Sequence, residues 1–237
     1  MSLNEFLPLA VIASSLLPGL IIFVLPERYL ALRTALNLLG AIAKIVFIAM
    51  LLSGVQAGED YGFRHAIAPG IELVFKADAL SLLFITLSAV LWLLTTFYAI
   101  GYLENAPHRS RFFGFFSLCV TATMGIAMAG NLFTFFVFYE LLTLSTFPLV
   151  AHRGTPDAKQ GASVYLAYTL TGGACLLTGI IWMNSLAGNA EFVHGGFAAT
   201  IGDGHETALR IIFVLLIIGV GVKAALVPLH GWLPKAM

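Results

Sequence analysis

The stretch FFVFYELLTLSTFPLV, residues 135–150, is an apolar run with a single carboxylate, Glu140, near its centre. Between Arg111 and Arg153 the sequence has no other Asp, Glu, Lys or Arg. Such a run is typical of a helix that crosses a bilayer, because about 20 apolar residues span the hydrocarbon core. A charge at that depth costs about 2.5–3.5 kcal/mol on insertion scales, so it usually faces a protein or water-lined interior. Glu140 is therefore a candidate functional residue.

The composition extends this interpretation to the whole chain. Of the 237 residues, 59% are hydrophobic and only 10% are charged, against about 25% charged residues in an ordinary soluble domain. These charges are too few to cover a soluble surface, so the sequence predicts an all-α polytopic membrane protein surrounded by lipid. A formal net charge of zero and the lack of a basic cluster argue against nucleic acid as a partner.

Seven apolar segments are long enough to span a membrane. They lie at about 6–26, 35–55, 78–100, 112–130, 132–151, 161–184 and 210–230. The fourth and fifth are separated only by Ala129-Gly130-Asn131, which reads as a turn. Residues 56–77 form a loop, in which apolar and charged residues alternate after Pro69-Gly70. That alternation predicts a short β-hairpin on the membrane face.

The basic residues of the loops predict the orientation, because cytoplasmic loops carry an excess of Lys and Arg. One side collects Arg28, Arg33, Arg109, Arg111, Arg153, Lys159 and Lys235. The other side collects Arg64, Lys76 and Arg210. The first side is thus expected in the cytoplasm and the N-terminus outside.

Lys223 lies inside the seventh segment, with Gly219 one turn before it and Pro228 five residues after it. Proline removes a backbone donor and clashes with the preceding turn, so this helix is expected to be broken. A break at membrane depth is tolerated mainly where it lines a cavity. The alternatives are a lysine that snorkels to an interface and, for Glu140, a structural carboxylate that ties two helices together.

Two further residues are weaker candidates. Lys44 lies nine residues into the second segment. It either transfers protons or has a structural role, or its side chain snorkels to an interface. His230 lies at the cytoplasmic end of the seventh segment, where it relays a proton to Lys223 or merely caps the end. No metal ligand spacing, phosphate loop or dinucleotide fingerprint occurs, so we expect no metal and no cofactor.

A lysine in the membrane releases its proton at neutral pH only if its surroundings change. Burial lowers the pKa of a lysine, and a nearby carboxylate raises it. A carboxylate that approaches Lys223 and moves off again would therefore load and unload a proton. Glu140 is the acid that the sequence offers for this role, and we expect the two side chains to lie in or near contact.

Four motifs together resemble the antiporter-like membrane subunits shared by Mrp-type monovalent cation/proton antiporters and respiratory complex I. The motifs are Asn131-Leu132, Phe138-Tyr139-Glu140-Leu141, Gly219–Lys223 and Pro228-Leu229-His230-Gly231-Trp232-Leu233-Pro234. The resemblance implies that a glutamate on the fifth helix and a lysine on a broken seventh helix form the central proton-transfer pair. These positions match Glu140 and Lys223.

The resemblance also implies a domain organisation. Residues 1–111 correspond to an N-terminal three-helix region with an extracytoplasmic loop at 56–77. Residues 112–237 correspond to the start of the first inverted repeat. Members of the family are about twice as long, so the chain is expected to be the N-terminal half of such a protein. Lys235 follows Trp-Leu-Pro where complex I members usually have aspartate, which favours the Mrp type, and within that type the D-like form.

Three functions remain open from the sequence. The first is a transporter subunit, not an enzyme, that exchanges H⁺ for Na⁺ within a hetero-oligomeric complex in a bacterial-type cell (inner) membrane. The second is a proton-pumping membrane subunit of an NADH:quinone oxidoreductase or a related hydrogenase complex. The third is a structural membrane scaffold with inert charges.

Overall fold

The computed structural model describes residues 3–103, 107–188, 191–193, 195–196, 201 and 204–236. The helices within these residues are α1 (Leu3–Val24), α2 (Leu30–Gln56), α3 (Ala79–Tyr102), α4 (Arg109–Ala127), α5 (Leu132–Val150), α6 (Pro156–Ala187), α7 (Glu206–Lys223) and α8 (Leu233–Ala236). The strands are β1 (Gly62–Ala68) and β2 (Ile71–Lys76). The prediction of a helical, polytopic membrane protein is confirmed.

Six helices of the described part, α1 to α6, are long and apolar enough to cross a membrane. Their outer faces suit lipid: Leu83, Leu87 and Leu94 of α3, for example, are each more than half exposed. The 18-residue α7 carries Glu206 and Arg210 as well as Lys223. The count of seven spans and the orientation stay predictions.

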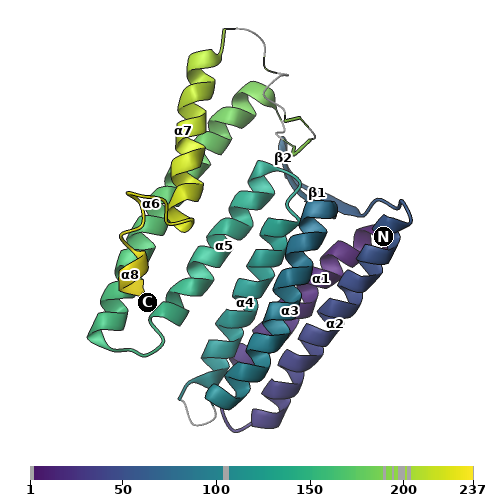
Figure 1. Cartoon of the computed structure of the whole chain (residues 1–237), viewed down its shortest axis with the longest axis vertical. Helices are drawn as coiled ribbons and strands as arrows, with labels where there is room; N and C mark the ends of the chain where they lie inside the picture. The colour runs from purple at the N-terminus through teal and green to yellow at the C-terminus, as the bar shows by residue number, and fades with distance from the viewer. Residues whose placement is uncertain are drawn as a thin grey trace. The chain divides into compact units, whose positions relative to one another are not determined.

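The chain divides into two compact units, and the first comprises Met1–His65 and Val74–Ala129. Within it, α1 packs against α2 and α4, and α3 packs against the same two helices, which gives a four-helix bundle (Figure 1). Glycine permits the close approach of the helices. A Cβ at Gly40 of α2 would lie 2.5 Å from the Ser14 carbonyl oxygen, and one at Gly19 of α1 would lie 2.9 Å from Ser117 Cβ.

The second unit comprises Ala66–Leu73 and Gly130–Met237. The long helix α6 packs against α5, α7 and α8 (Figure 1). The contact between α6 and α7 is tight, because a Cβ at Gly219 would lie 2.6 Å from Leu176 Cβ and 3.0 Å from the Gly172 carbonyl oxygen. Gly219 therefore allows α6 and α7 to approach closely.

The predicted hairpin and turn are both present. β1 and β2 pair with each other, and Pro69-Gly70 joins them, with Gly70 at a φ of +75°. Asn131 caps α5, since its side-chain oxygen accepts the Thr134 N–H at 2.8 Å. The division into compact units falls after Ala129, whereas the predicted domain boundary at 111/112 follows the repeat of the family; that boundary stays a prediction.

Candidate functional site

Glu140 lies in the middle of α5, with its carboxylate against α6. A Cβ at Gly173 of α6 would collide with Glu140 Oε1, so the absence of a side chain at Gly173 makes room for the acid. Oε1 is buried and accepts no hydrogen bond from the described residues. Buried polar atoms ordinarily have a partner, and one without is often a functional group. The carboxylate is thus accommodated sterically without being neutralised by a hydrogen bond at this oxygen.

Lys223 is the last residue of α7, not a residue well inside its helix as the sequence suggested. Its ammonium donates a hydrogen bond to the Tyr139 carbonyl oxygen at 2.6 Å. The same nitrogen lies 4.0 Å from the centroid of the Tyr139 ring, in cation–π geometry. A positive charge is favourable at a helix C-terminus, where backbone carbonyls are unsatisfied and the helix dipole is negative.

The helix breaks before Pro228, because the chain reverses at Ala225. Ala225 has a φ of +52°, and the N–H of Leu226 bonds to the Gly221 carbonyl at 3.0 Å. The Ala225 N–H bonds to the Val222 carbonyl at 3.1 Å, which completes a Schellman-type helix end. The predicted break is therefore real, but it begins several residues upstream of the proline.

The indole of Trp232 closes this helix end. Its Nε1–H donates to the Val222 carbonyl at 2.8 Å, and its ring packs edge-to-face on Tyr165 of α6 at 5.2 Å. The segment between α7 and α8 thus folds back on the end of α7 and fixes the position of Lys223. Sequence analysis quoted Trp232 only as part of a motif and missed this role, although a tryptophan N–H in an apolar segment normally needs an acceptor.

Tyr139 joins α5 to α7 at two points, and sequence analysis gave it no role. It is 3% exposed, and its hydroxyl donates to the Gly219 carbonyl at 2.7 Å. Its own carbonyl accepts from Thr143 Oγ1 at 3.1 Å as well as from Lys223. The signal was present, since a phenol within a membrane helix must find a hydrogen-bond partner.

Lys223 therefore contacts α5 directly beside Glu140. The ammonium sits on the carbonyl of the residue that precedes Glu140, and it acts electrostatically on the Glu140 carboxylate. Chemically, this arrangement offers a proton donor and a proton acceptor separated by a polar backbone group. The direct contact expected between the two side chains stays a prediction.

The two weaker candidates lie elsewhere. His230 is exposed in the segment between α7 and α8, and it is not among the groups described above that hold Lys223. Lys44 belongs to the first unit and is fully buried in the middle of α2, where Nζ donates to Ser15 Oγ at 2.7 Å. Because no part of Lys44 reaches the surface, the snorkelling interpretation is wrong. Within the described residues no cluster of three or more His, Cys, Asp or Glu could hold a metal.

Two family models match the chain. Residues 129–237 match the model described as NADH:quinone oxidoreductase/Mrp antiporter, transmembrane, and residues 68–113 match NADH-ubiquinone oxidoreductase (complex I), chain 5 N-terminus. The first range contains all four motifs, and the second lies before them in the chain. The resemblance seen in the sequence is confirmed.

Curated relatives are named as antiporter subunits. The A1 subunit of the Na(+)/H(+) antiporter of Staphylococcus haemolyticus is 31% identical over 195 residues, 81% of this chain and 24% of that protein. The A/B subunit of a probable K(+)/H(+) antiporter of Rhizobium meliloti is 29% identical over 203 residues, 84% of this chain and 20% of that protein. The chain spans about a quarter of the length of such relatives. These relatives are named as A or A/B subunits, whereas the sequence suggested the D-like form.

A solved structure has the same fold. One chain of the membrane-bound sulfane sulfur reductase, described as an archaeal respiratory membrane complex, superposes with a TM-score of 0.85 at 22% identity. The match covers 97% of this chain and 47% of the other.

Proposed function

The chain belongs to the family of antiporter-like membrane subunits that Mrp-type antiporters share with complex I, and we propose that it is the proton-translocating part of a multi-subunit Na⁺/H⁺ antiporter. The observation that carries this proposal is the placement of Lys223 on the Tyr139 carbonyl, directly beside Glu140. The named relatives are subunits of cation/proton antiporters, which supports Na⁺ or another monovalent cation as the second ion. By the same likeness we propose a bacterial-type cell membrane and other membrane subunits as partners.

The proposed mechanism is a proton switch. A charged Glu140 carboxylate near Lys223 favours the ammonium form, so the lysine holds a proton. When Glu140 is protonated or turns away, the ammonium loses this negative charge but keeps its contacts with the Tyr139 carbonyl and ring, which are neutral. The ammonium then releases one proton and becomes a neutral amine. Each pKa unit between the two arrangements corresponds to about 1.36 kcal/mol, which a charge pair in a poorly hydrated interior can supply.

The role of the helix end is to place the amine reproducibly. Tyr139 and Trp232 bond to carbonyls of α7 at Gly219 and Val222, on either side of one helical turn. Lys223 follows immediately, so its backbone has little freedom while its side chain can change partners. A fixed backbone with a mobile charge is what a proton carrier between two polar regions requires.

The second candidate is the membrane subunit of a proton-pumping oxidoreductase, in which partner subunits supply the electron transfer. Both family models name NADH oxidoreductases in their descriptions, which keeps this candidate open. The partners separate the two functions. Intact-mass spectrometry of the gently purified native complex should find small membrane subunits for an antiporter and redox subunits for a pump.

The residue-level test compares Lys223→Ala with Lys235→Ala, since Lys235 is an exposed lysine in the neighbouring helix α8. In everted vesicles that hold the assembled complex, a Na⁺ pulse should collapse an imposed pH gradient with Lys235→Ala but not with Lys223→Ala. Proton flux that survives Lys223→Ala in an assembled complex would favour a structural scaffold with inert charges.

A further inference from the structure

The four-helix bundle of the first unit has a polar interior. Eight buried polar side chains, each at most 6% exposed, lie within it: Ser15, Arg33, Asn37, Lys44, Thr96, Ser110, Ser117 and Thr121. Burial of polar groups in a membrane protein is expensive and usually marks a path for ions or protons. None of these residues takes part in the arrangement around Lys223.

The inner end of this polar file is Lys44. Its ammonium donates to Ser15 Oγ, and Ser15 Oγ lies 2.8 Å from Thr121 Oγ1. The face of Trp92 lies 4.8 Å from the ammonium nitrogen. The groups near Lys44 are thus all uncharged: Ser15 of α1, Trp92 of α3 and, through Ser15, Thr121 of α4. The described part of the chain gives this lysine no carboxylate partner.

The middle of the file continues along α2 and α4. Thr121 Oγ1 donates to the Ser117 carbonyl at 2.9 Å, and Ser117 Oγ donates to Asn37 Oδ1 at 3.3 Å. Asn37 Nδ2 then donates to the Arg33 carbonyl at 3.1 Å. These contacts lead from Lys44 back toward the N-terminal end of α2, without a break in polar groups.

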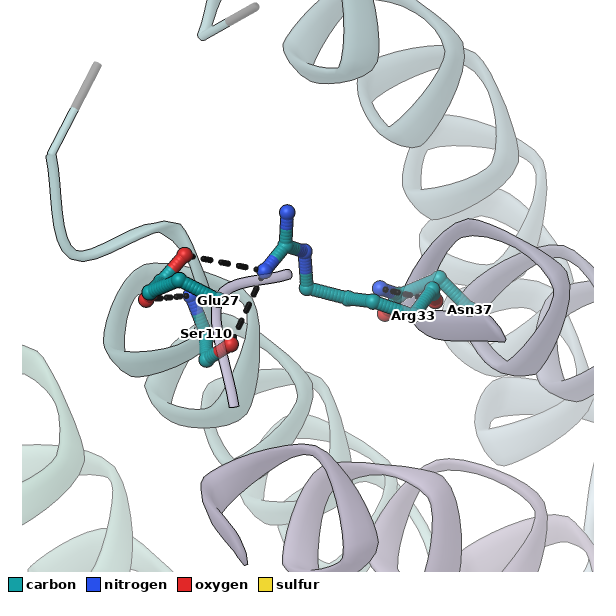
Figure 2. A network of polar contacts seen from close by, with 4 residues as sticks. All are labelled: Glu27, Arg33, Asn37 and Ser110. Atoms are coloured by element: carbon teal, nitrogen blue, oxygen red, sulfur yellow. Dashed lines mark hydrogen bonds and ion pairs between the residues drawn. The ribbon is translucent and has the colours of Figure 1, made fainter. Parts of the chain in front are cut away.

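The outer end is the network of Figure 2. Arg33 Nη1 donates to Glu27 Oε2 at 3.0 Å and to Ser110 Oγ at 2.9 Å, while Glu27 Oε1 accepts the Ser110 N–H at 2.9 Å. Here the bundle has a cavity of about 300 Å³, with Arg33 and Arg109 in its wall. The side chain of Glu27 is half exposed, so this end of the file reaches solvent.

Two buried groups on α3 lack partners beside this file. Trp92 Nε1 and Thr96 Oγ1 form no hydrogen bond with the described residues, and their side chains are 2% and 0% exposed. They lie one turn apart on the same helix face, between Lys44 and the end of α3 that meets the cavity. Unpaired buried donors of this kind usually bind water.

We propose that the first unit contains a proton path of its own, which runs from the cavity at Arg33 and Glu27 to Lys44. Hydroxyl groups and water carry the proton along this path. The amide of Asn37 and the backbone carbonyls hold the hydroxyl groups in place but do not transfer protons themselves. In one cycle the Lys44 ammonium passes a proton to the file and becomes a neutral amine, and one proton reaches solvent at the cavity. A proton that enters from the opposite face of the membrane reloads the amine, so one proton crosses per cycle.

The charges of the path select protons over metal cations. Among the described residues of the path, Arg33, Arg109 and Lys44 outnumber the carboxylate of Glu27, so a Na⁺ or K⁺ ion meets a net positive wall. A proton can hop between hydroxyl groups and water without any hydrated metal ion passing these positive charges. The path is therefore separate in chemistry from the cation half of the exchange.

Hydroxyl-radical footprinting of the intact complex tests for water in the path without requiring transport. Trp92 should be oxidised several-fold faster than Met128, which is as deeply buried in the same unit and chemically reactive. Thr121→Val replaces a hydroxyl of the file by a methyl group of similar size, so it should slow the oxidation of Trp92 without unfolding the bundle. Equal, slow oxidation of Trp92 and Met128 would overturn the proposal.

Proton flux tests the role of the lysine itself. Lys44→Arg keeps the charge and a donor for Ser15, but the reference pKa of arginine is higher by about two units or more, which lowers the neutral fraction about 100-fold. Flux in the assembled complex should fall more than about tenfold, whereas Lys159→Arg, an exposed control, should leave it unchanged. Full flux with Lys44→Arg would reduce Lys44 to a structural role. Loss with Lys44→Arg but not with Glu140→Gln would instead overturn the mechanism proposed for Lys223.

Discussion

Gly173→Ala is the smallest change that should disturb the proposed proton switch. The added Cβ would collide with Glu140 Oε1, the end of a flexible side chain, and with no backbone atom as closely. The oxygen must retreat by roughly 1 Å or more to reach an ordinary C···O distance of about 3.3–3.6 Å. The helices can therefore stay in place while the carboxylate moves.

The size of the effect follows from Coulomb's law. If the charge separation of Glu140 and Lys223 grows from about 4 Å to about 6 Å, the attraction falls from about 4.2 to about 2.8 kcal/mol at an effective dielectric constant of about 20. The difference of about 1.4 kcal/mol is a factor of about ten in proton occupancy. An off-rotamer Glu140 costs only about 0.5–1.5 kcal/mol, so the complex should still assemble.

The assay is the rate of Na⁺-induced proton movement in everted vesicles, normalised to the amount of assembled complex. Gly173→Ala should lower this rate about tenfold. Ser163→Thr, which adds a methyl group at an exposed position of α6, should not change it. A double-mutant cycle with Glu140→Asp separates geometry from general damage, because the shorter acid no longer reaches the new methyl group.

Gly173→Ala should thus add little to the effect of Glu140→Asp alone. Full flux with Gly173→Ala in an assembled complex, or strictly additive losses in the cycle, would refute this account of the site.

Three further predictions concern the scaffold of the two units. Tyr139→Phe removes the hydrogen bond to Gly219 but keeps the ring and the carbonyl, so the free energy of unfolding should fall by about 1 kcal/mol while proton flux persists. Tyr139→Leu also removes the ring beneath the Lys223 ammonium and should lower proton flux. Burial raises the pKa of Glu27, but the Ser110 N–H and the nearby Arg33 outweigh burial and hold that pKa below its usual value, so the stability that Glu27 contributes is present at neutral pH and is lost as the pH falls through the folded pKa. Melting curves of Glu27→Gln should accordingly differ from those of the unmodified protein at pH 7 and converge in acid, and a constant difference would contradict this. Gly161→Ala would drive a Cβ into a backbone carbonyl of α8, so limited proteolysis should cleave the segment after α7 faster.

The sequence was sufficient for the parts of the fold that depend on local chemistry. The apolar segments predicted the membrane helices, and Pro69-Gly70 with alternating residues predicted the hairpin. The turn at Ala129-Gly130-Asn131 also lies where expected, because Asn131 is a strong helix cap. These features need only periodicity and turn preference.

The site was predicted only in part, because its geometry depends on contacts distant in sequence. A charge within an apolar run identified Glu140 and Lys223, but it could not show that the Tyr139 side chain of α5 bonds to α7. The proline marked a helix break without fixing its start, since the end of α7 depends on a left-handed residue, Ala225, that the sequence does not signal. The surroundings of Lys44 could not be predicted either, because its partner Ser15 comes from α1 and contacts Thr121 of α4.

Proton movement by the purified complex in liposomes, with and without Glu140→Gln, tests the central claim most directly. The unmodified complex should acidify or alkalinise the lumen in response to a Na⁺ gradient, as a trapped pH dye reports. The Gln variant retains the shape of the side chain against Gly173 but cannot carry the negative charge, so its rate should equal the leak of empty liposomes. Equal rates for both complexes would contradict the account, because a proton switch at Lys223 requires that charge.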